Sequence, residues 1–218
     1  MPSQPFKANL FATGTSTSGP TLSNIFFFLL HYPQAYDQAV AEIRASFDSE
    51  EEIVLGPRLK SCKFLFACID ETLRLCPVLA NILPRTVQAG GLSVGDCVLP
   101  EGTGVGASIY ALHKNEALFP DPHLFKPERF LGEDANGNKV LPSGYVPYST
   151  GPRTCPGWRL AVVEASLTVA RTLYRYDVRL AGAGSLAPSV SEAPERKYRS
   201  WVGLKVDGPI AQFRQREL

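Results

Sequence analysis

The chain has 218 residues, 44% of them hydrophobic, and its 22 basic and 21 acidic residues give a formal net charge of +1. This length and composition are typical of one globular domain with a buried core. So small a net charge provides no broad basic field, which argues against nucleic acid or a membrane surface as a partner.

The first third of the chain is expected to be helical. One apolar helical pattern ends before Pro33 and a later one before Pro77, because proline disfavours helix in the residue that precedes it. The longest apolar run, residues 25–30, is far shorter than the ~20 residues that span a bilayer, and the first residues do not resemble a signal peptide. We therefore expect no membrane anchor in this chain, an acidic loop at 48–52, and helices at 6–32, 34–46 and 59–75.

Short strands and a long loop are expected in the middle of the chain. Residues 85–87 and 92–94 have strand composition with Gly90-Gly91 as the turn between them, and residues 96–103 indicate another hairpin. Residues 119–148 are rich in proline, glycine and aspartate, and loops of that length are usually functional or wrapped around something. With helices at 107–113 and 158–174, and strands beyond 178, the predicted fold class is mainly α with small β-sheets.

The cysteines do not have the pattern of a disulfide framework or a zinc site, because their number is odd and no pair has the CxxC spacing. Four of the five lie among apolar residues and are expected to be small buried hydrophobes, whereas the last lies among glycine, proline and arginine. They are Cys62, Cys68, Cys76, Cys97 and Cys155.

The surroundings of Cys155 favour a thiolate. The cysteine directly precedes the last helix, where unpaired backbone N–H groups and the helix dipole stabilise a negative charge, and Arg153 is close by. Gly151 and Gly157 allow a tight turn or the close approach of a flat ligand, and Pro156 fixes the chain. This pattern predicts an exposed, rigidly held sulfur that is suited to bind a metal permanently.

The run from Tyr148 to Gly157 resembles the haem-binding loop of the cytochromes P-450, F-x-x-G-x-R-x-C-x-G, with Tyr148 in place of the phenylalanine. The resemblance implies haem b as the cofactor, Cys155 as the axial ligand of the haem iron, and Arg153 as a contact of a haem propionate. Tyr148 keeps the aromatic ring but adds a hydroxyl group that needs a partner, and we expect it to tune the site.

Two further motifs resemble this family. Glu71 and Arg74 match its E-x-x-R helix, and their apolar flanks predict that the charge pair is buried and fully satisfied. Arg129, in the sequence PERF, matches the arginine that completes a Glu-Arg-Arg cluster, since one carboxylate can bind two guanidinium groups. The resemblance gives these three residues a structural role under the haem.

The first helix resembles the family's oxygen-activating segment. Gly14 and Thr17 match its pattern, but Ser16 stands where the family has an acid. The resemblance implies that Thr17 and Ser16 take part in proton delivery to oxygen, although a serine is a poor proton donor. Pro20 predicts a kink nearby, because it has no N–H group for the carbonyl of Ser16.

Arg85 matches an arginine that commonly reaches a haem propionate in this family. His113 is interpreted as a structural histidine and is left out of the iron site. Residues 77–83, with Leu10 and Phe11, are expected to form an apolar wall, which favours a lipophilic substrate.

The resemblance extends from about Asn9 to the end of the chain. It implies that residues 1–218 are the C-terminal, haem-binding half of the cytochrome P-450 fold, with the N-terminal half absent. It also implies a monooxygenase that inserts one oxygen atom from O2 into a lipophilic molecule, with electrons from an NADPH-dependent reductase. Members usually reside at the endoplasmic-reticulum membrane and face the cytoplasm.

Two alternatives stay open. Family members are about twice as long as this chain, so it is either active or a truncated, inactive fragment that still binds haem. The missing acid at Ser16 also permits an isomerase, a dehydratase or a peroxide-driven enzyme that requires no reductase.

Overall fold

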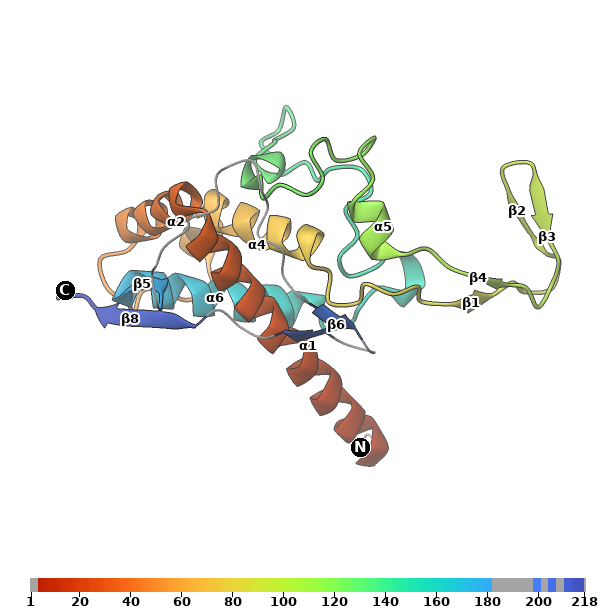
Figure 1. Cartoon of the computed structure of the whole chain (residues 1–218), viewed down its shortest axis with the longest axis horizontal. Coiled ribbons are helices and arrows are strands. Elements are labelled where there is room, and N and C mark those ends of the chain that lie inside the picture. The colour runs from red at the N-terminus through yellow and green to blue at the C-terminus, as the bar shows by residue number, and fades with distance from the viewer. Residues whose placement is uncertain (1–3, 182–197, 201–203, 207–209, 218) are drawn as a thin grey trace.

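The computed structural model describes residues 4–181, 198–200, 204–206 and 210–217, and the side chains of residues 13–181 and 210–217. It is mainly helical with small two-stranded sheets, as predicted (Figure 1). The helices are α1 (Gln4–His31), α2 (Pro33–Ser46), α3 (Pro57–Lys60), α4 (Lys63–Leu75), α5 (Ile109–His113) and α6 (Trp158–Arg175), with 3-10 helices η1 (Pro127–Phe130) and η2 (Gly151–Arg153).

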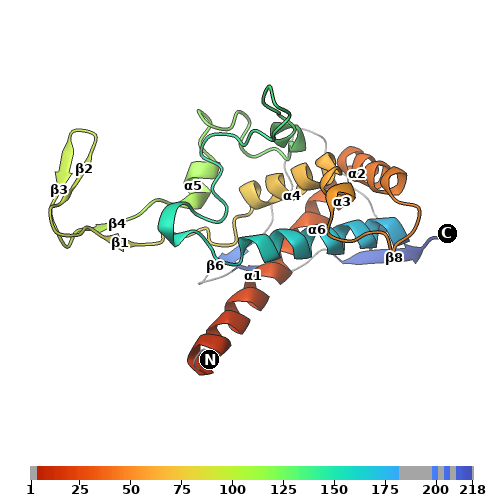
Figure 2. The ribbon, with the colours of Figure 1, turned by 180° about the vertical axis from the view of Figure 1, so that it is seen from behind.

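The core lies where α1, α2, α4 and α6 meet. Figures 1 and 2 show α1 crossing α6, with α4 on the other side of the crossing, and the N-terminal part of α1 extending away from the bundle. The long loop joins this core through Phe125, whose ring stacks on Phe28 of α1 with centroids 5.0 Å apart. Each of the four helices contributes fully buried aliphatic side chains, among them Ile25, Leu29, Ile43, Leu65, Val169 and Leu173.

The helix predicted at 59–75 is in fact two helices, α3 and α4. Glu42 of α2 accepts hydrogen bonds from the backbone N–H groups of Phe64 and Leu65, both at 2.9 Å. In a continuous helix these groups would donate to the carbonyls of residues 60 and 61. The carboxylate therefore caps α4 from a neighbouring helix and favours a break at Cys62, whose backbone is not helical.

The predicted strands exist, but their predicted pairing is wrong. β1 (Arg85–Thr86) pairs with β4 (Gly104–Val105), and β2 (Leu92–Val94) pairs with β3 (Cys97–Leu99). The turn between β2 and β3 is Gly95-Asp96. Gly90-Gly91, the predicted hairpin turn, lies between β1 and β2, which do not pair with each other. Gly95 has a φ of 55°, and a two-residue hairpin turn requires such positive angles.

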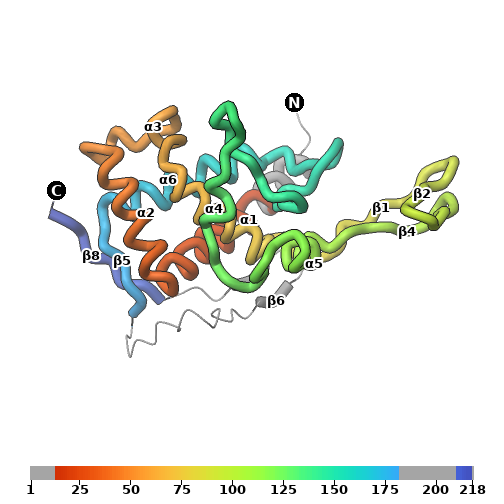
Figure 3. Tube along the Cα trace, turned by 90° about the horizontal axis from the view of Figure 1, so that it is seen from above, coloured from red at the N-terminus to blue at the C-terminus, as the bar shows by residue number. Residues whose placement is uncertain are grey.

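The β2–β3 hairpin projects from the body of the molecule (Figure 3). The apolar side chains of Leu92, Val94 and Val98 are exposed, and Cys97 is exposed with them. The prediction that Cys97 is buried is therefore wrong, because apolar neighbours on an isolated two-stranded ribbon have no core to pack against.

The end of the described chain is β-structure, as predicted. α6 leads directly into β5 (Tyr176–Leu180), which pairs antiparallel with β8 (Ala211–Gln215), and β6 (Tyr198–Ser200) pairs with β7 (Leu204–Val206). Across the ranges described here, no helix combines the length and the apolarity needed to cross a membrane.

Candidate functional site

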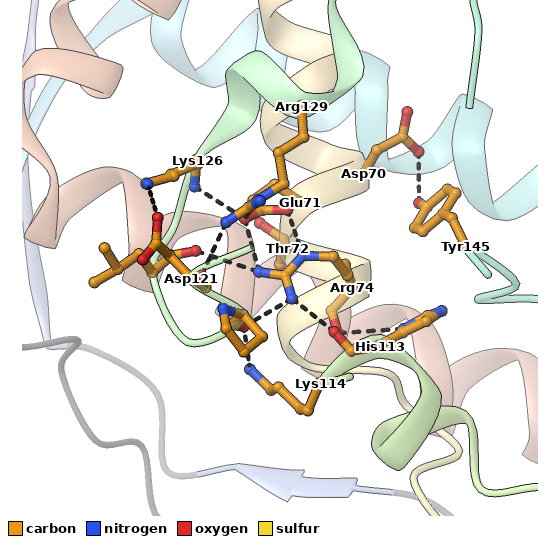
Figure 4. Close-up of polar contacts among 12 residues, drawn as sticks. Asp70, Glu71, Thr72, Arg74, His113, Lys114, Asp121, Lys126, Arg129 and Tyr145 are labelled. Atoms are coloured by element: carbon orange, nitrogen blue, oxygen red, sulfur yellow. Dashed lines mark hydrogen bonds and ion pairs between the residues drawn. The ribbon is translucent and has the colours of Figure 1, made fainter. Parts of the chain in front are cut away.

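Glu71 is the centre of a buried ionic cluster (Figure 4). The guanidinium of Arg74 binds its carboxylate with two hydrogen bonds of 2.7 and 2.8 Å, and both side chains are 0% exposed. Arg129 approaches the same carboxylate from η1 at 3.3 Å, and the backbone N–H of Lys126 donates to it at 2.9 Å. The carboxylate thus binds two guanidinium groups, in the setting that the apolar flanks predict.

The long loop is fastened to the same cluster. The remaining N–H groups of Arg74 donate to three backbone carbonyls, and Arg129 donates to a fourth at 2.8 Å. The acceptors of Arg74 are His113 at 2.8 Å, Pro122 at 2.8 Å and Leu124 at 3.2 Å. The long loop is therefore held on the Glu71 cluster by one of its own side chains, Arg129, and by its backbone carbonyl groups, which accept hydrogen bonds from Arg74 and Arg129.

His113 closes the other end of the loop. Its Nε2 accepts a hydrogen bond from the N–H of Val146 at 3.0 Å, so its Nδ1 carries the proton and donates to the carbonyl of Arg74 at 3.2 Å. The pKa of His113 is lowered to about 4, chiefly by burial, with the hydrogen bond to Arg74 opposing the shift and the charges of Arg74 and Lys114 adding to it. A buried, neutral histidine with two backbone partners has a structural role.

The low pKa of His113 predicts a loss of stability in acid. The unfolded chain takes up a proton near pH 6.5 and the folded chain near pH 4, so stability is complete above pH 6.5 and decreases as the pH falls through this window. The expected contribution is on the order of 3 kcal/mol at pH 4. Urea unfolding between pH 7 and pH 4 measures it.

A His113→Gln variant cannot titrate and should show a smaller dependence on pH than the parent chain. His123 is exposed, so His123→Gln should leave the dependence as it is. Equal slopes for the parent and His113→Gln would contradict the assignment of this proton.

Asp70 lies beside Glu71 but points to a different partner (Figure 4). It accepts a hydrogen bond from the hydroxyl of Tyr145 at 2.7 Å and forms an ion pair with Lys139. Burial raises the pKa of Tyr148, and the negative charges of Asp70 and Cys155 raise it further. The Tyr148 hydroxyl therefore lies in a buried setting that opposes its ionisation.

The loop around Cys155 is shaped by backbone contacts. The N–H of Cys155 donates to the carbonyl of Tyr148 at 3.0 Å, and Gly151, with a φ of 73°, begins η2 in a conformation that favours glycine. A Cβ atom on Gly157 would meet only the sulfur of Cys155, at 3.9 Å, among the described atoms within 4 Å. Cys155 and Pro156 are exposed. The loop presents an uncovered sulfur that fits a flat, metal-bearing ligand.

Arg153 and Arg85 are both exposed. Arg85 donates to the carbonyl of its neighbour Pro84 at 2.9 Å, and neither guanidinium forms an ion pair with any residue that the structure describes. Both side chains are therefore suited to bind an anionic group.

The hydroxyl groups of Thr17 and Ser16 bond to their own helix. Both donate to the carbonyl of Thr13, at 2.8 and 3.4 Å respectively, while a Cβ atom on Gly14 would meet open space. α1 continues as helix through Pro20, and the kink predicted there stays a prediction. The structure does not describe the side chains of Leu10 and Phe11, so the apolar wall predicted from these residues and residues 77–83 stays a prediction.

The two halves of the candidate site thus lie on different elements, the sulfur on the loop before α6 and the hydroxyl groups on α1. The contact that joins them was not singled out in the sequence: Ser18 donates to Glu164 of α6 at 2.6 Å. Ser18 and Glu164 are far apart in the sequence and form no sequence motif together, so their contact could not be predicted from the sequence.

Comparison with known proteins gives consistent matches. The sequence model of the family described as "Cytochrome P-450" matches residues 7–193. A cytochrome P-450 monooxygenase of Gibberella zeae is 38% identical over 219 residues, which cover 96% of this chain and 50% of that protein. The monooxygenase poxM of Penicillium oxalicum is 38% identical over 95% of this chain and 39% of its own length. The monooxygenase apf8 of Gibberella fujikuroi is 37% identical, with 96% and 59% covered.

The chain therefore spans about half the length of the curated relatives that it matches.

Proposed function

Because the chain belongs to the cytochrome P-450 family, we propose that it forms the haem-binding portion of a monooxygenase that oxidises a lipophilic small molecule with O2. The observation that carries this proposal is the exposed sulfur of Cys155, held by the backbone of a glycine-rich loop directly before α6. When bound, haem b with a thiolate ligand supplies the oxygen-activating chemistry.

The chain's own residues have separate roles in this proposal. Cys155 is the iron ligand, Gly151 and Gly157 leave space for the ring, and Arg153 and Arg85 bind the propionates. The cluster of Glu71, Arg74 and Arg129 holds the long loop in place.

Proton delivery is assigned to α1. The hydroxyl group of Thr17 donates its proton to a helix carbonyl, and its oxygen keeps its lone pairs, so that oxygen can accept a hydrogen bond from a water molecule on the open side of the helix. Ser16 can relay a proton but is a poor source of one. An NADPH-dependent reductase is the proposed electron donor.

Haem titration of the purified chain tests the proposal. We expect stoichiometric binding, and a ferrous carbon monoxide adduct with the absorption of a thiolate-ligated haem. Binding without that absorption would mean that Cys155 is not the ligand, and no binding would contradict the haem-binding assignment.

A second candidate function is supported by Ser16, which replaces the family's acid. A peroxide-driven or isomerase-type haem-thiolate enzyme does not need that acid for the activation of O2. Product formation with peroxide, but not with NADPH and a reductase, would favour this candidate, whereas a haem-loaded chain that is inactive under both conditions would indicate an inactive haem-binding fragment.

A further inference from the structure

α1 and α6 carry the two sides of the proposed haem site, and a polar contact joins them where they cross. The hydroxyl of Ser18, the residue after Thr17, donates to Oε2 of Glu164 at 2.6 Å. Glu164 follows Cys155 by nine residues and lies in the first half of α6. Figure 2 shows the crossing from behind, with the two helices diverging toward the N-terminal part of each.

This contact lies at the boundary between packed and open surfaces. Beyond it, Ile25 of α1 and Val169 of α6 are fully buried in the shared core. Before it, residues 13–16 of α1 are exposed, and so are residues 155–160, with Leu160 at 71%. The two helices therefore separate on the N-terminal side of this contact, where Thr17 lies on α1 and the loop of Cys155 leads into α6.

We propose that Glu164 is a positioning residue that, through Ser18, sets the separation of α1 and α6 at the open side of the proposed haem site. The inference rests on the proposed function and extends it, because it assigns a role to a residue outside the sequence motifs. A hydroxyl that donates to a carboxylate forms a short, directional bond, which suits a spacer.

Charge pairing does not account for the position of Glu164. It is the one acidic residue of α6, a helix with three arginines, yet it forms no ion pair with a residue in the described ranges. Its partner is instead a neutral hydroxyl on the opposite helix. Exposed polar contacts of this kind contribute little to folding, so we assign it to the geometry of the open side.

The test uses four variants in the haem-loaded chain. Ser18→Ala and Glu164→Ala each remove one partner, and the double variant removes both. Ser18→Thr keeps the donor and serves as the conservative variant. Thr172→Ala is the control, because that hydroxyl of α6 donates to the carbonyl of Thr168 in its own helix at 2.7 Å.

Two measurements decide the outcome. We expect haem transfer to excess apomyoglobin to be about tenfold faster in each single variant, as for the loss of one hydrogen bond, and no faster in the double variant. The C–O stretching frequency of the ferrous carbon monoxide adduct should shift equally in Ser18→Ala, Glu164→Ala and the double variant. Ser18→Thr and Thr172→Ala should match the parent chain in both measurements.

A purely structural role would reduce haem content without moving the C–O band, and additive effects of the two substitutions would mean that they do not act through their contact. Either result would overturn the inference. If the parent chain binds no haem, the proposed function fails. The distance between spin labels at the exposed positions Gly14 of α1 and Leu160 of α6 then decides the contact, because an unchanged distance in Ser18→Ala and Glu164→Ala overturns the inference as well.

Discussion

An Arg74→Ala variant is expected to lose about 3–5 kcal/mol of the chain's free energy of unfolding and to bind no stable haem. The substitution leaves Glu71 in a site with 0% exposure, where only Arg129 at 3.3 Å remains as a cationic partner. It also removes the donor for the carbonyls of His113 and Leu124 and leaves the carbonyl of Pro122 with Lys114 alone, so the start of the long loop is loosened. Urea unfolding and the haem content of the purified protein measure the two effects.

Arg58 offers a matched control on the surface. Its guanidinium also forms two ion pairs, with Glu52 at 2.6 Å and Asp48 at 3.1 Å, but all three side chains are exposed. Arg58→Ala should therefore cost less than about 1 kcal/mol. Equal losses for the two variants would show that burial does not set the strength of the Glu71 cluster.

A Cys155→Ala variant is expected to lose the thiolate-type absorption of the ferrous carbon monoxide adduct completely. Alanine has no side-chain atom that can bind the iron. Because the loop is shaped by backbone contacts such as Cys155 N–H to Tyr148 carbonyl, its fold should survive the loss of the sulfur. Absorption spectroscopy after haem titration is the measurement.

Cys97→Ala is the control, because Cys97 is the other exposed cysteine and lies on the distant β2–β3 hairpin. Its spectrum should equal that of the parent chain. An unchanged spectrum in Cys155→Ala would identify a different ligand for the iron.

The helical part of the fold could be predicted from the sequence, because proline and apolar periodicity mark helix ends and faces locally. The predicted limits of α1, α2 and α6 agree with the structure to within a few residues. The break before α4 could not be predicted, because it depends on Glu42, which reaches its N–H groups from another helix. Strand pairing was predicted wrongly because Gly90-Gly91 and Gly95-Asp96 both have the composition of a turn. Gly90 and Gly91 also adopt positive φ, but they lie in the connection between β1 and β2, and the hairpin closes at Gly95.

The candidate site divides in the same way. The haem-loop pattern and the E-x-x-R pair consist of short segments, so their residues were identifiable from spacing and resemblance. The acceptors of Arg74 are backbone carbonyls, which every residue possesses, and the sequence therefore gives no sign of them. The partners of His113 and Glu164 are likewise set by folding and have no local signature.

The attachment of the long loop to Arg74 has a consequence for dynamics. The N–H of Lys126, which donates to Glu71, and the N–H of Val146, which donates to His113, lie in an irregular segment, where amide protons usually exchange with solvent rapidly. Here the acceptors are the buried side chains of Glu71 on α4 and His113 on α5, and His113 is in turn hydrogen-bonded to Arg74 of α4, so we expect these amides to be protected together with the C-terminal turn of α4. The loop and that helix therefore form one cooperative unit, in which an irregular segment acquires the exchange protection of a helical core.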